Sequence, residues 1–104
     1  MAVTVKENIR LFDALEKMES ERARLIFVID SKDSLVGVMS QGDLLKISNL
    51  LAPINSYMEM NPVYLFDKDS ARALEVMKQY QFSEIPILTE QYKILEVVSI
   101  WELV

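Results

Sequence analysis

The sequence contains neither cysteine nor histidine among its 104 residues. Zinc sites built on thiolates or imidazoles, redox dithiols and nucleophile–imidazole catalysis all depend on these side chains. Their absence excludes those chemistries. An independent enzyme has almost no support, because nothing in the sequence pairs an acid with a base or activates a nucleophile. We therefore expect no catalytic residue and no metal site.

Cations and long apolar runs are also scarce. Eleven Lys and Arg residues stand against 16 Asp and Glu residues, which gives a formal net charge of −5. Nucleic-acid binding needs a basic face, so DNA and RNA are poor partners. No apolar run approaches the roughly 18–20 residues of a membrane span, and the first residues lack the pattern of a secretory signal. We expect a cytoplasmic protein without a membrane partner, in which any phosphate-bearing ligand binds backbone N–H groups.

The sequence does contain an internal duplication. Shifted by 59 residues, the chain matches itself without a gap, so that Ala14–Met18 falls on Ala73–Met77 and Leu35–Ser40 falls on Ile94–Ser99. Apolar positions fall on apolar positions throughout. A period of this length with two copies indicates two similar halves packed together, because each half is too small to bury its own apolar face. Any binding site should then exist in two related versions.

The periodicity of the first half predicts its elements. Asn8 is a candidate N-cap. The apolar stripe of Phe12, Leu15 and Met18, with Leu11 and Ala14 alongside, predicts a helix packed on a core. Two apolar runs separated by an acidic turn predict two strands covered on both faces. The expected order is strand 4–5, helix 9–20, strands 25–29 and 35–39, and helix 41–48.

The second half repeats this order. The expected elements are strand 63–66, helix 70–80, and strands 85–88 and 94–98. Asp67 and Asp69 supply negative charge to the start of the helix. The final helix is missing, so we expect the chain to be part of a longer protein. Residues 49–61 are too apolar for a flexible linker and predict an ordered connector with a short helical turn.

Two segments carry a resemblance to a known family. Leu35–Asp43 reads Leu-Val-Gly-Val-Met-Ser-Gln-Gly-Asp, and Met58–Pro62 reads Met-Glu-Met-Asn-Pro. The first resembles the hydrophobic-Gly-hydrophobic-x-Thr/Ser-x-x-Asp signature of cystathionine-β-synthase (CBS) domains, and the second resembles the Met-x-x-x-Pro lead into a second copy. A tandem CBS pair implies an α+β fold of two β-α-β-β-α repeats packed about a pseudo-twofold axis. Repeat 1 would span residues 1–48, the connector 49–61, and repeat 2, with its final helix truncated, 62–104.

Three shorter stretches carry a narrower resemblance. They are Ser-Gln-Gly-Asp-Leu, Asn-Pro-Val-Tyr-Leu-Phe and Val-Val-Ser-Ile-Trp-Glu-Leu. Their sequence pattern is similar to that of the CBS pairs that precede a sugar-phosphate nucleotidyltransferase domain in bacterial cell-surface sugar pathways. This resemblance implies that a catalytic domain follows Val104 and that this chain is its regulatory or assembly part.

The candidate ligand site lies where the strand 35–39 meets the helix 41–48. Ser40 places a hydroxyl beside the first free N–H groups of the helix, which favours a phosphate. Asp43 can accept two hydrogen bonds from a ribose diol, and Gly42 lets a ligand approach the backbone. The CBS resemblance implies an adenosine ligand, such as AMP, ADP, ATP or S-adenosylmethionine. The candidate ligand-binding residues are Ser40, Gln41, Gly42, Asp43, Thr4, Val5, Ile26 and Phe27.

A weaker second site is expected at the equivalent positions of the second half. Its residues are Ile85, Pro86, Ser99 and Glu102. Here Glu96 replaces the signature glycine, and we expect the bulk of Trp101 to crowd a ribose. Capping of the following turn is the favoured role for Ser99 and Glu102.

Two functions remain open, because Ser-x-x-Asp at a helix start is also a capping box. The first hypothesis is a regulatory module that senses an adenine-nucleotide-type ligand and acts on a fused or partner enzyme domain, with no cofactor required. The alternative is a ligand-free dimerisation or scaffolding module. A homodimer is expected, because the helices leave apolar surface that a second copy can cover.

Overall fold

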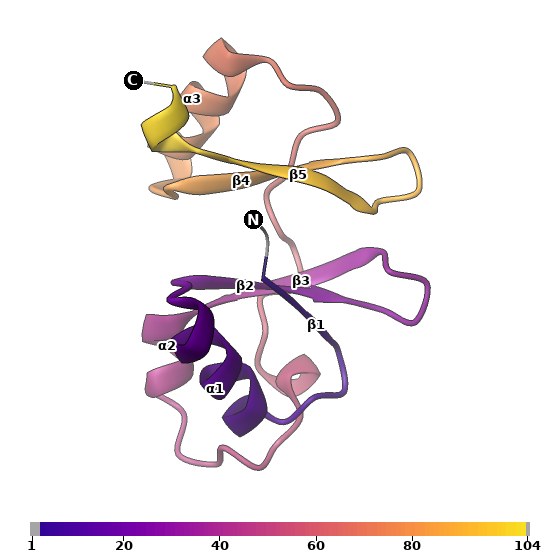
Figure 1. The fold of residues 1–104 in the computed structure, drawn as a ribbon, viewed down its shortest axis with the longest axis vertical. Coiled ribbons are helices and arrows are strands. Elements are labelled where there is room, and N and C mark those ends of the chain that lie inside the picture. Colours follow the sequence, from indigo (N-terminus) through magenta and orange to yellow (C-terminus); the bar gives the residue numbers. More distant parts are fainter. Residues whose placement is uncertain (1–2, 104) are drawn as a thin grey trace. The chain divides into compact units, whose positions relative to one another are not determined.

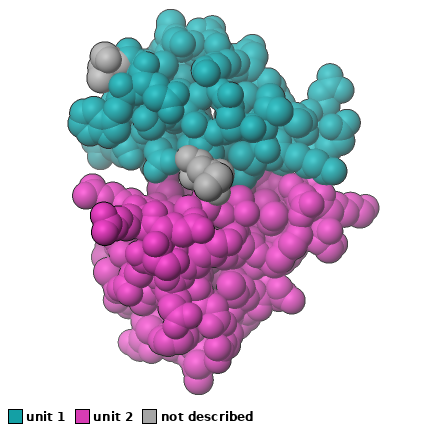
Figure 2. All heavy atoms as spheres, viewed as in Figure 1, with its two compact units in different colours: residues 1, 63–104 teal, residues 2–62 magenta. Residues whose placement is uncertain are grey.

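The computed structural model describes residues 3–103, which fold as two compact units. Within the described residues, the N-terminal unit comprises residues 3–62 and the C-terminal unit residues 63–103, coloured magenta and teal in Figure 2. Each unit has its own apolar cluster. Ile26 is fully buried in the first cluster and Ile85 occupies the equivalent place in the second, as the duplication predicts.

The N-terminal unit is a three-stranded sheet with two helices on one face (Figure 1). Strand β1 (Thr4–Lys6) runs parallel to β2 (Leu25–Ile29), and β3 (Leu35–Ser40) runs antiparallel to β2. The helices are α1 (Leu11–Glu21) and α2 (Gln41–Leu45). The predicted strands and the order of the elements are confirmed.

Helix α1 begins later than predicted, and its buried face leaves out Phe12. Asn8 is not its N-cap; the cap position is Arg10, whose side chain makes no capping bond. Instead, the N–H groups of Leu11 and Phe12 donate to carbonyls of the connector, at 2.9 and 2.8 Å. The tertiary fold thus supplies the acceptors that a local cap would have given. Leu11 is fully buried, whereas Phe12 is 45% exposed, so the predicted stripe is wrong at Phe12.

The two long strands of this unit differ in how they are covered. Residues Ile26–Val28 of β2 are buried in succession, as predicted for a strand covered on both faces. In β3, buried and half-buried residues alternate, which is the pattern of a strand with one well-covered face. The prediction of two covered faces is therefore wrong for β3.

The connector is ordered and belongs to the N-terminal unit. Its 3-10 turn η1 (Ile54–Ser56) confirms the predicted helical turn, and Ile54 is fully buried in the core cluster. Farther along, Glu59 pairs with Val38 at the outer edge of β3: each N–H donates to the other residue's carbonyl, at 2.9 and 3.0 Å. The carbonyl groups that accept from the start of α1 also lie in this segment. Helix α2 ends at Leu45, earlier than the predicted residue 48.

The C-terminal unit repeats this plan with fewer elements. Helix α3 (Ser70–Tyr80) matches the prediction, and Asp69 caps it by accepting from the Arg72 N–H at 3.2 Å. Strands β4 (Glu84–Leu88) and β5 (Ile94–Ser99) form an antiparallel pair, followed by the 3-10 turn η2 (Ile100–Glu102). Helix α3 and η2 lie on one face of this pair (Figure 1).

The predicted strand 63–66 does not form. Only Leu65 bridges to Ile87, donating to the Pro86 carbonyl and accepting from the Leu88 N–H, at 3.1 and 2.8 Å. The reason lies in Pro86. Its equivalent Phe27 donates its N–H to the β1 side of the sheet, and proline has no N–H to donate.

The turns confirm the duplication independently of the core. The non-glycine residues with positive φ in residues 3–103 form two pairs separated by 59 positions: Arg22 with Gln81, at 54° and 59°, and Asp33 with Tyr92, at 66° and 63°. Such conformations are uncommon for residues with a Cβ atom. Their recurrence shows that the two halves share backbone detail as well as apolar pattern. No helix within residues 3–103 has the length and apolarity required to cross a membrane.

Candidate functional site

Ser40 ends β3 and is the N-cap of α2. Its φ and ψ of −87° and 154° are those of extended backbone, and its Oγ accepts a hydrogen bond from the Asp43 N–H at 3.1 Å. The next residue, Gln41, donates its N–H to the Arg24 carbonyl at 2.9 Å. These two bonds fix the strand-to-helix junction from both sides.

Gly42 leaves this junction open. A Cβ atom built on Gly42 would meet only the Ser40 Oγ, at 4.0 Å. Within residues 3–103, the Gly42 N–H has no acceptor outside its own short helix. Because α2 has only five residues, this N–H would attract an anion mainly as a hydrogen-bond donor, with little help from a helix dipole.

Asp43 lies beside this opening with its carboxylate in solvent. Its side chain is 69% exposed, and Oδ1 lies 3.9 Å from the Lys46 Nζ. The carboxylate does not reach back to the Ser40 N–H among the hydrogen bonds of the described residues, so only half of the predicted capping box is present. Asp43 therefore has free acceptor capacity for a diol.

The strand register divides the remaining candidate residues between two faces of the sheet. Thr4 is the partner of Phe27, and two residues away Leu25 is the partner of Ser40, so the side chains of Thr4, Phe27 and Ser40 share one face. Val5 and Ile26 point to the opposite face, into the core cluster, where they are 6% and 0% exposed. The Ile26 side chain therefore cannot contact a ligand, which corrects the predicted site at that position, and Phe27, on the other face, is itself only 3% exposed.

The second candidate site has a different geometry. Ile100 donates its N–H to the Ser83 carbonyl at 2.8 Å, which reproduces the bond of Gln41. Ser99, however, makes no capping bond with its side chain, so the predicted cap is wrong there. The three-residue turn η2 replaces a helix. Trp101 is 79% exposed on this turn.

The other second-site residues are unsuited to contacting a ligand with their side chains. Ile85 and Pro86 are buried in β4, and Ile85 belongs to the core cluster. Glu102 is exposed on η2. The strongest candidate constellation is thus the open junction of Ser40, Gly42 and Asp43 in the first repeat.

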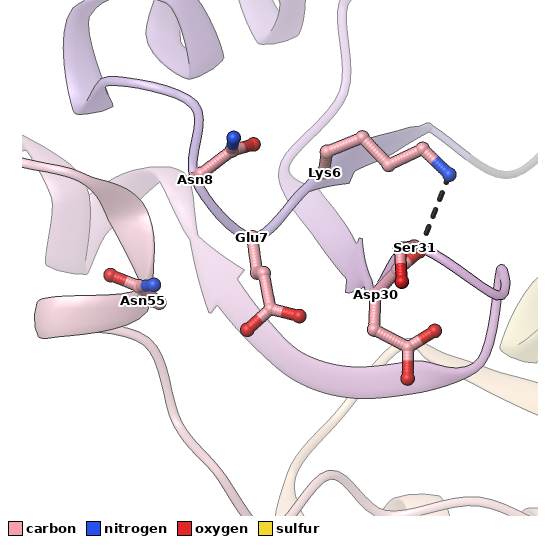
Figure 3. Close-up of a pocket in the computed structure, with 6 residues that line it drawn as sticks. All are labelled: Lys6, Glu7, Asn8, Asp30, Ser31 and Asn55. Atoms are coloured by element: carbon pink, nitrogen blue, oxygen red, sulfur yellow. Dashed lines mark hydrogen bonds between the residues drawn. The ribbon is translucent and has the colours of Figure 1, made fainter.

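Sequence reasoning missed a polar cavity at the other end of the N-terminal sheet. It has a volume of about 560 Å³ and is lined by Lys6, Glu7, Asn8, Asp30, Ser31 and Asn55 (Figure 3). The Lys6 Nζ donates to the Asp30 carbonyl at 3.3 Å and pairs with Asp33. Backbone N–H groups of Ser34 and Lys32 lower the pKa of Asp30. The Asp-rich run is the signal in the sequence, although its pattern alone predicts only a turn.

A neighbouring cavity of about 490 Å³ includes Thr4 and Val5 in its lining. It also borders Lys6 and Lys17, and Lys17 donates to the Thr4 carbonyl at 2.6 Å. Neither cavity includes Ser40 or Asp43 in its lining. Among the described residues, no cluster of three or more acidic side chains is placed to hold a metal ion.

The equivalent end of the C-terminal unit is aromatic. Phe66 and Tyr92 stand where the first repeat has Glu7 and Asp33, and with Tyr64 they pack edge to face, with ring centroids 5.3 to 5.8 Å apart. Burial, followed by the neighbouring Tyr92, raises the pKa of Tyr64. The two repeats have thus diverged at both ends of their sheets.

Known proteins share part of this sequence. Residues 2–49 match the model of the CBS domain family. An uncharacterised 17.7 kDa protein from Acidianus ambivalens is 27% identical over 103 residues, covering 95% of this chain and 63% of the relative. The CBS domain-containing protein CBSCBSPB5 from Arabidopsis thaliana is 31% identical over 94 residues, covering 84% of this chain and 17% of the relative. This chain thus spans less than two thirds of either relative.

Solved structures extend the similarity across both repeats. CBSX2 in complex with AMP has a TM-score of 0.89, with 21% identity over 98% of this chain and 84% of CBSX2. The chain has the fold of solved CBS domain pairs. The cytosolic domain of the Mg²⁺ channel MgtE in complex with ATP gives a TM-score of 0.88, with 24% identity and coverage of 98% and 43%. The CBS pair of MJ0100 in complex with methylthioadenosine and S-adenosylmethionine gives 0.82, with 19% identity and coverage of 94% and 84%.

The family match and the geometry both indicate that the first repeat resembles a CBS domain more closely than the second does. The matched residues 2–49 include the complete first candidate site and none of the second. The identities to the solved structures are all below 25%, so these structures establish the fold. Ligand binding by this chain has to be argued from its own residues.

Proposed function

We propose that this CBS pair is a regulatory module that senses an adenine-nucleotide-type ligand at its first repeat. The single observation that carries the proposal is the open junction at Gly42, where an N–H donor and the exposed carboxylate of Asp43 lie side by side. A nucleoside phosphate presents an anion that can accept from such an N–H group and a ribose diol that can donate to such a carboxylate. Gly42 is exposed to solvent.

Each part of the ligand has a proposed contact. The phosphate accepts from the Gly42 N–H and the Ser40 hydroxyl, and the ribose diol donates to Asp43. The base lies on the face of the sheet that carries Thr4; the Phe27 side chain shares this face but is only 3% exposed. Support comes from CBS pairs of the same fold that hold AMP, ATP or S-adenosylmethionine.

The module regulates and does not catalyse, in this proposal. Occupancy of the site shifts the equilibrium between conformations of a fused or partner enzyme domain. MgtE, in which the similar region is part of a larger cytosolic domain, supports the idea of a fused partner. A sugar-phosphate nucleotidyltransferase domain following Val104, in the cytoplasm, is the partner that the sequence resemblance favours. No nucleic acid or membrane takes part.

The proposal includes a homodimer. Large apolar side chains stay exposed on the helical elements, including Phe12, Leu45, Tyr80 and Trp101, at 45, 62, 52 and 79%. A second copy of the chain would cover such surface. Light scattering should give twice the chain mass of 12.0 kDa, and a monomer at high concentration would contradict the homodimer.

The second candidate function is a ligand-free dimerisation or scaffolding module. One observation favours it: the Ser40 Oγ already accepts from the Asp43 N–H, which is a complete structural role without a ligand. In this case Asp43 only places a negative charge in the first turn of α2.

A thermal-shift panel distinguishes the two functions. The probes are AMP, ADP, ATP, S-adenosylmethionine, GDP, CDP and CMP, each in large excess. A ligand at 100 times its dissociation constant stabilises the folded state by about 2.7 kcal/mol. We expect at least one adenine compound to raise the unfolding midpoint. If the protein is a dimer and none of the seven compounds raises the midpoint, the scaffolding function is the correct one.

A further inference from the structure

Lys17 is a half-buried cation on α1 whose only partner among the described residues is a main-chain carbonyl. Its Nζ donates to the Thr4 carbonyl at 2.6 Å. Within residues 3–103, Lys17 forms no ion pair, and Asp13, one turn earlier on α1, is held by Arg10 at 2.8 and 3.0 Å. A half-buried charge without a counter-ion is unfavourable, so an anion beside Lys17 would stabilise the folded chain.

The outer edge of β1 supplies a second donor beside this ammonium group. The carbonyl of Val3 and the N–H of Glu7 bond to β2, at 2.9 and 3.1 Å. Alternation along a parallel strand therefore turns the main-chain groups of Thr4 and Lys6 away from β2. Both of their carbonyls are occupied, one by Lys17 and the other by the N–H of the following turn at 3.2 Å. The Lys6 N–H has no acceptor within residues 3–103, so a donor remains at this edge.

These donors border the cavity of about 490 Å³ beside β1 and α1, which we call the Lys17 cavity. Its volume lies within the range of small-molecule pockets. Two lysines and Asn8 line it, and none of its described lining residues carries a carboxylate. Ile9 and Ile29 add apolar, half-buried side chains to the lining. The Lys17 cavity thus combines hydrogen-bond donors with an apolar wall.

The ion pairs around the Lys17 cavity determine the charge of a matching ligand. Lys6 is neutralised by its ion pair with Asp33, whereas Lys17 has no such pair in the described part of the chain. One unneutralised positive charge matches a monoanion better than a phosphate dianion. The nearest acidic lining belongs to the neighbouring polar cavity, and Figure 3 shows the Asn8 amide pointing away from the Glu7 carboxylate.

We propose that the Lys17 cavity binds a small organic carboxylate with a short aliphatic body. The carboxylate accepts from the Lys17 ammonium group and the Lys6 N–H, and the aliphatic body packs on Ile9 and Ile29. The site belongs to the first repeat alone, because Val76 occupies the position equivalent to Lys17. It does not depend on nucleotide binding, since the open junction at the start of α2 does not line this cavity.

Butyrate is the probe for the Lys17 cavity, and amide NMR spectra of the ¹⁵N-labelled protein are the readout. We expect saturable shifts of the Lys6 amide, with the Gly42 amide unmoved. Butylamine has the same aliphatic body with the opposite charge and should not bind. Inorganic phosphate lacks the aliphatic body and should bind roughly tenfold more weakly than butyrate.

Three variants test which groups hold the carboxylate. Lys17→Met removes the charge and keeps the stem, and we expect it to weaken butyrate binding roughly tenfold or more. Lys78→Met removes the same charge from α3 and should bind as the wild type does. Asn8→Asp adds a carboxylate to the lining without removing a side-chain hydrogen bond of residues 3–103, and it should weaken binding to a similar degree.

Circular dichroism of the variants separates loss of the site from loss of fold. If Lys17→Met loses its fold with its bond to Thr4, Asn8→Asp decides the outcome. Equal butyrate binding by the wild type and the folded variants overturns the proposal. Binding of butylamine or phosphate as tight as that of butyrate, or no saturable shift at Lys6 with millimolar butyrate, also overturns it. These outcomes are independent of AMP binding, which is read at Gly42.

Discussion

In the first repeat, Ser40 caps a five-residue helix beside an open glycine, whereas in the second repeat Ser99 caps nothing and leads into a three-residue turn. The residue after each serine makes the same hydrogen bond in both repeats. Gln41 donates its N–H to the Arg24 carbonyl at 2.9 Å, and Ile100 donates its N–H to the Ser83 carbonyl at 2.8 Å. Duplication has thus kept the backbone frame while the chemistry at the junction diverged. The comparison indicates that a shared fold does not make two equivalent sites.

The core should be the least diverged part of the two repeats. Met18 and Met77 are related by the 59-residue shift and are 0% and 1% exposed. Replacing either with alanine deletes buried groups and leaves a cavity, so we expect Met18→Ala and Met77→Ala each to lower the free energy of unfolding by roughly 2–5 kcal/mol. Urea unfolding monitored by circular dichroism measures both losses. Costs differing by more than about 2 kcal/mol would contradict equivalent cores.

The next prediction exchanges a residue between the repeats. Gly37→Glu places a side chain against Met58, and overpacking of this kind costs roughly 1–3 kcal/mol. Glu96→Gly, the reverse exchange, removes only an exposed ion pair and should cost about 1 kcal/mol or less. The same unfolding experiment measures both. A cost for Glu96→Gly as large as that for Gly37→Glu would show that the connector does not set the difference between these positions.

The capping serines provide a smaller contrast. Ser40→Ala removes the acceptor of the Asp43 N–H, and loss of an N-cap typically costs about 1 kcal/mol. Ser99→Ala removes no capping bond and should be close to neutral. The matched pair can be compared by thermal unfolding without ligand. Equal destabilisation would mean that η2 is capped in solution.

The smallest expected effect is in the hairpin turns. Acid should weaken the turn of the first repeat and leave that of the second unchanged. Asp30 accepts from the N–H groups of Lys32 and Ser34, at 2.8 and 3.0 Å, and these bonds lower its pKa from the ordinary 3.8. A lowered pKa means that the bonds stabilise the turn above pH 3.8 and that this contribution is lost as the pH falls through the lower folded-state value. The equivalent Thr89 accepts from Gln91 and Lys93 without titrating.

Amide exchange in acid tests this contrast directly. As the pH falls below 3.8, protection at Lys32 should decline while protection at Lys93 stays constant relative to the intrinsic rates. Asp30→Thr should remove the decline at Lys32. Parallel decline in both turns would point to global acid unfolding and not to Asp30.

Much of this fold could be predicted from local pattern. The bounds of α3 follow from its apolar period and from Asp69, which are local signals. The start of α1 could not be predicted, since its first N–H groups donate to the distant carbonyls of Leu50 and Ala52. The sequence did contain the signal that no strand forms at residues 63–66, because Pro86 lacks the donor that pairing requires.

The candidate site was predictable in part. Ser40, Gly42 and Asp43 lie together at one junction, as their spacing indicated. Val5 and Ile26 do not join them, because strand residues alternate between faces and their register places them in the core. The exposed ring of Trp101 could not be foreseen, since exposure depends on which neighbours the turn η2 brings close.

Calorimetric titration tests the central claim, that the first repeat alone binds a nucleotide. AMP is titrated into the wild-type protein and into Asp43→Ala and Glu102→Ala. We expect one AMP per chain for the wild type, and a roughly 10- to 150-fold loss of affinity for Asp43→Ala, since a hydrogen bond to a charged acceptor is worth about 1.5–3 kcal/mol. Glu102→Ala should bind as the wild type does. Two AMP molecules per chain, or equal losses in the two variants, would contradict binding by the first repeat alone.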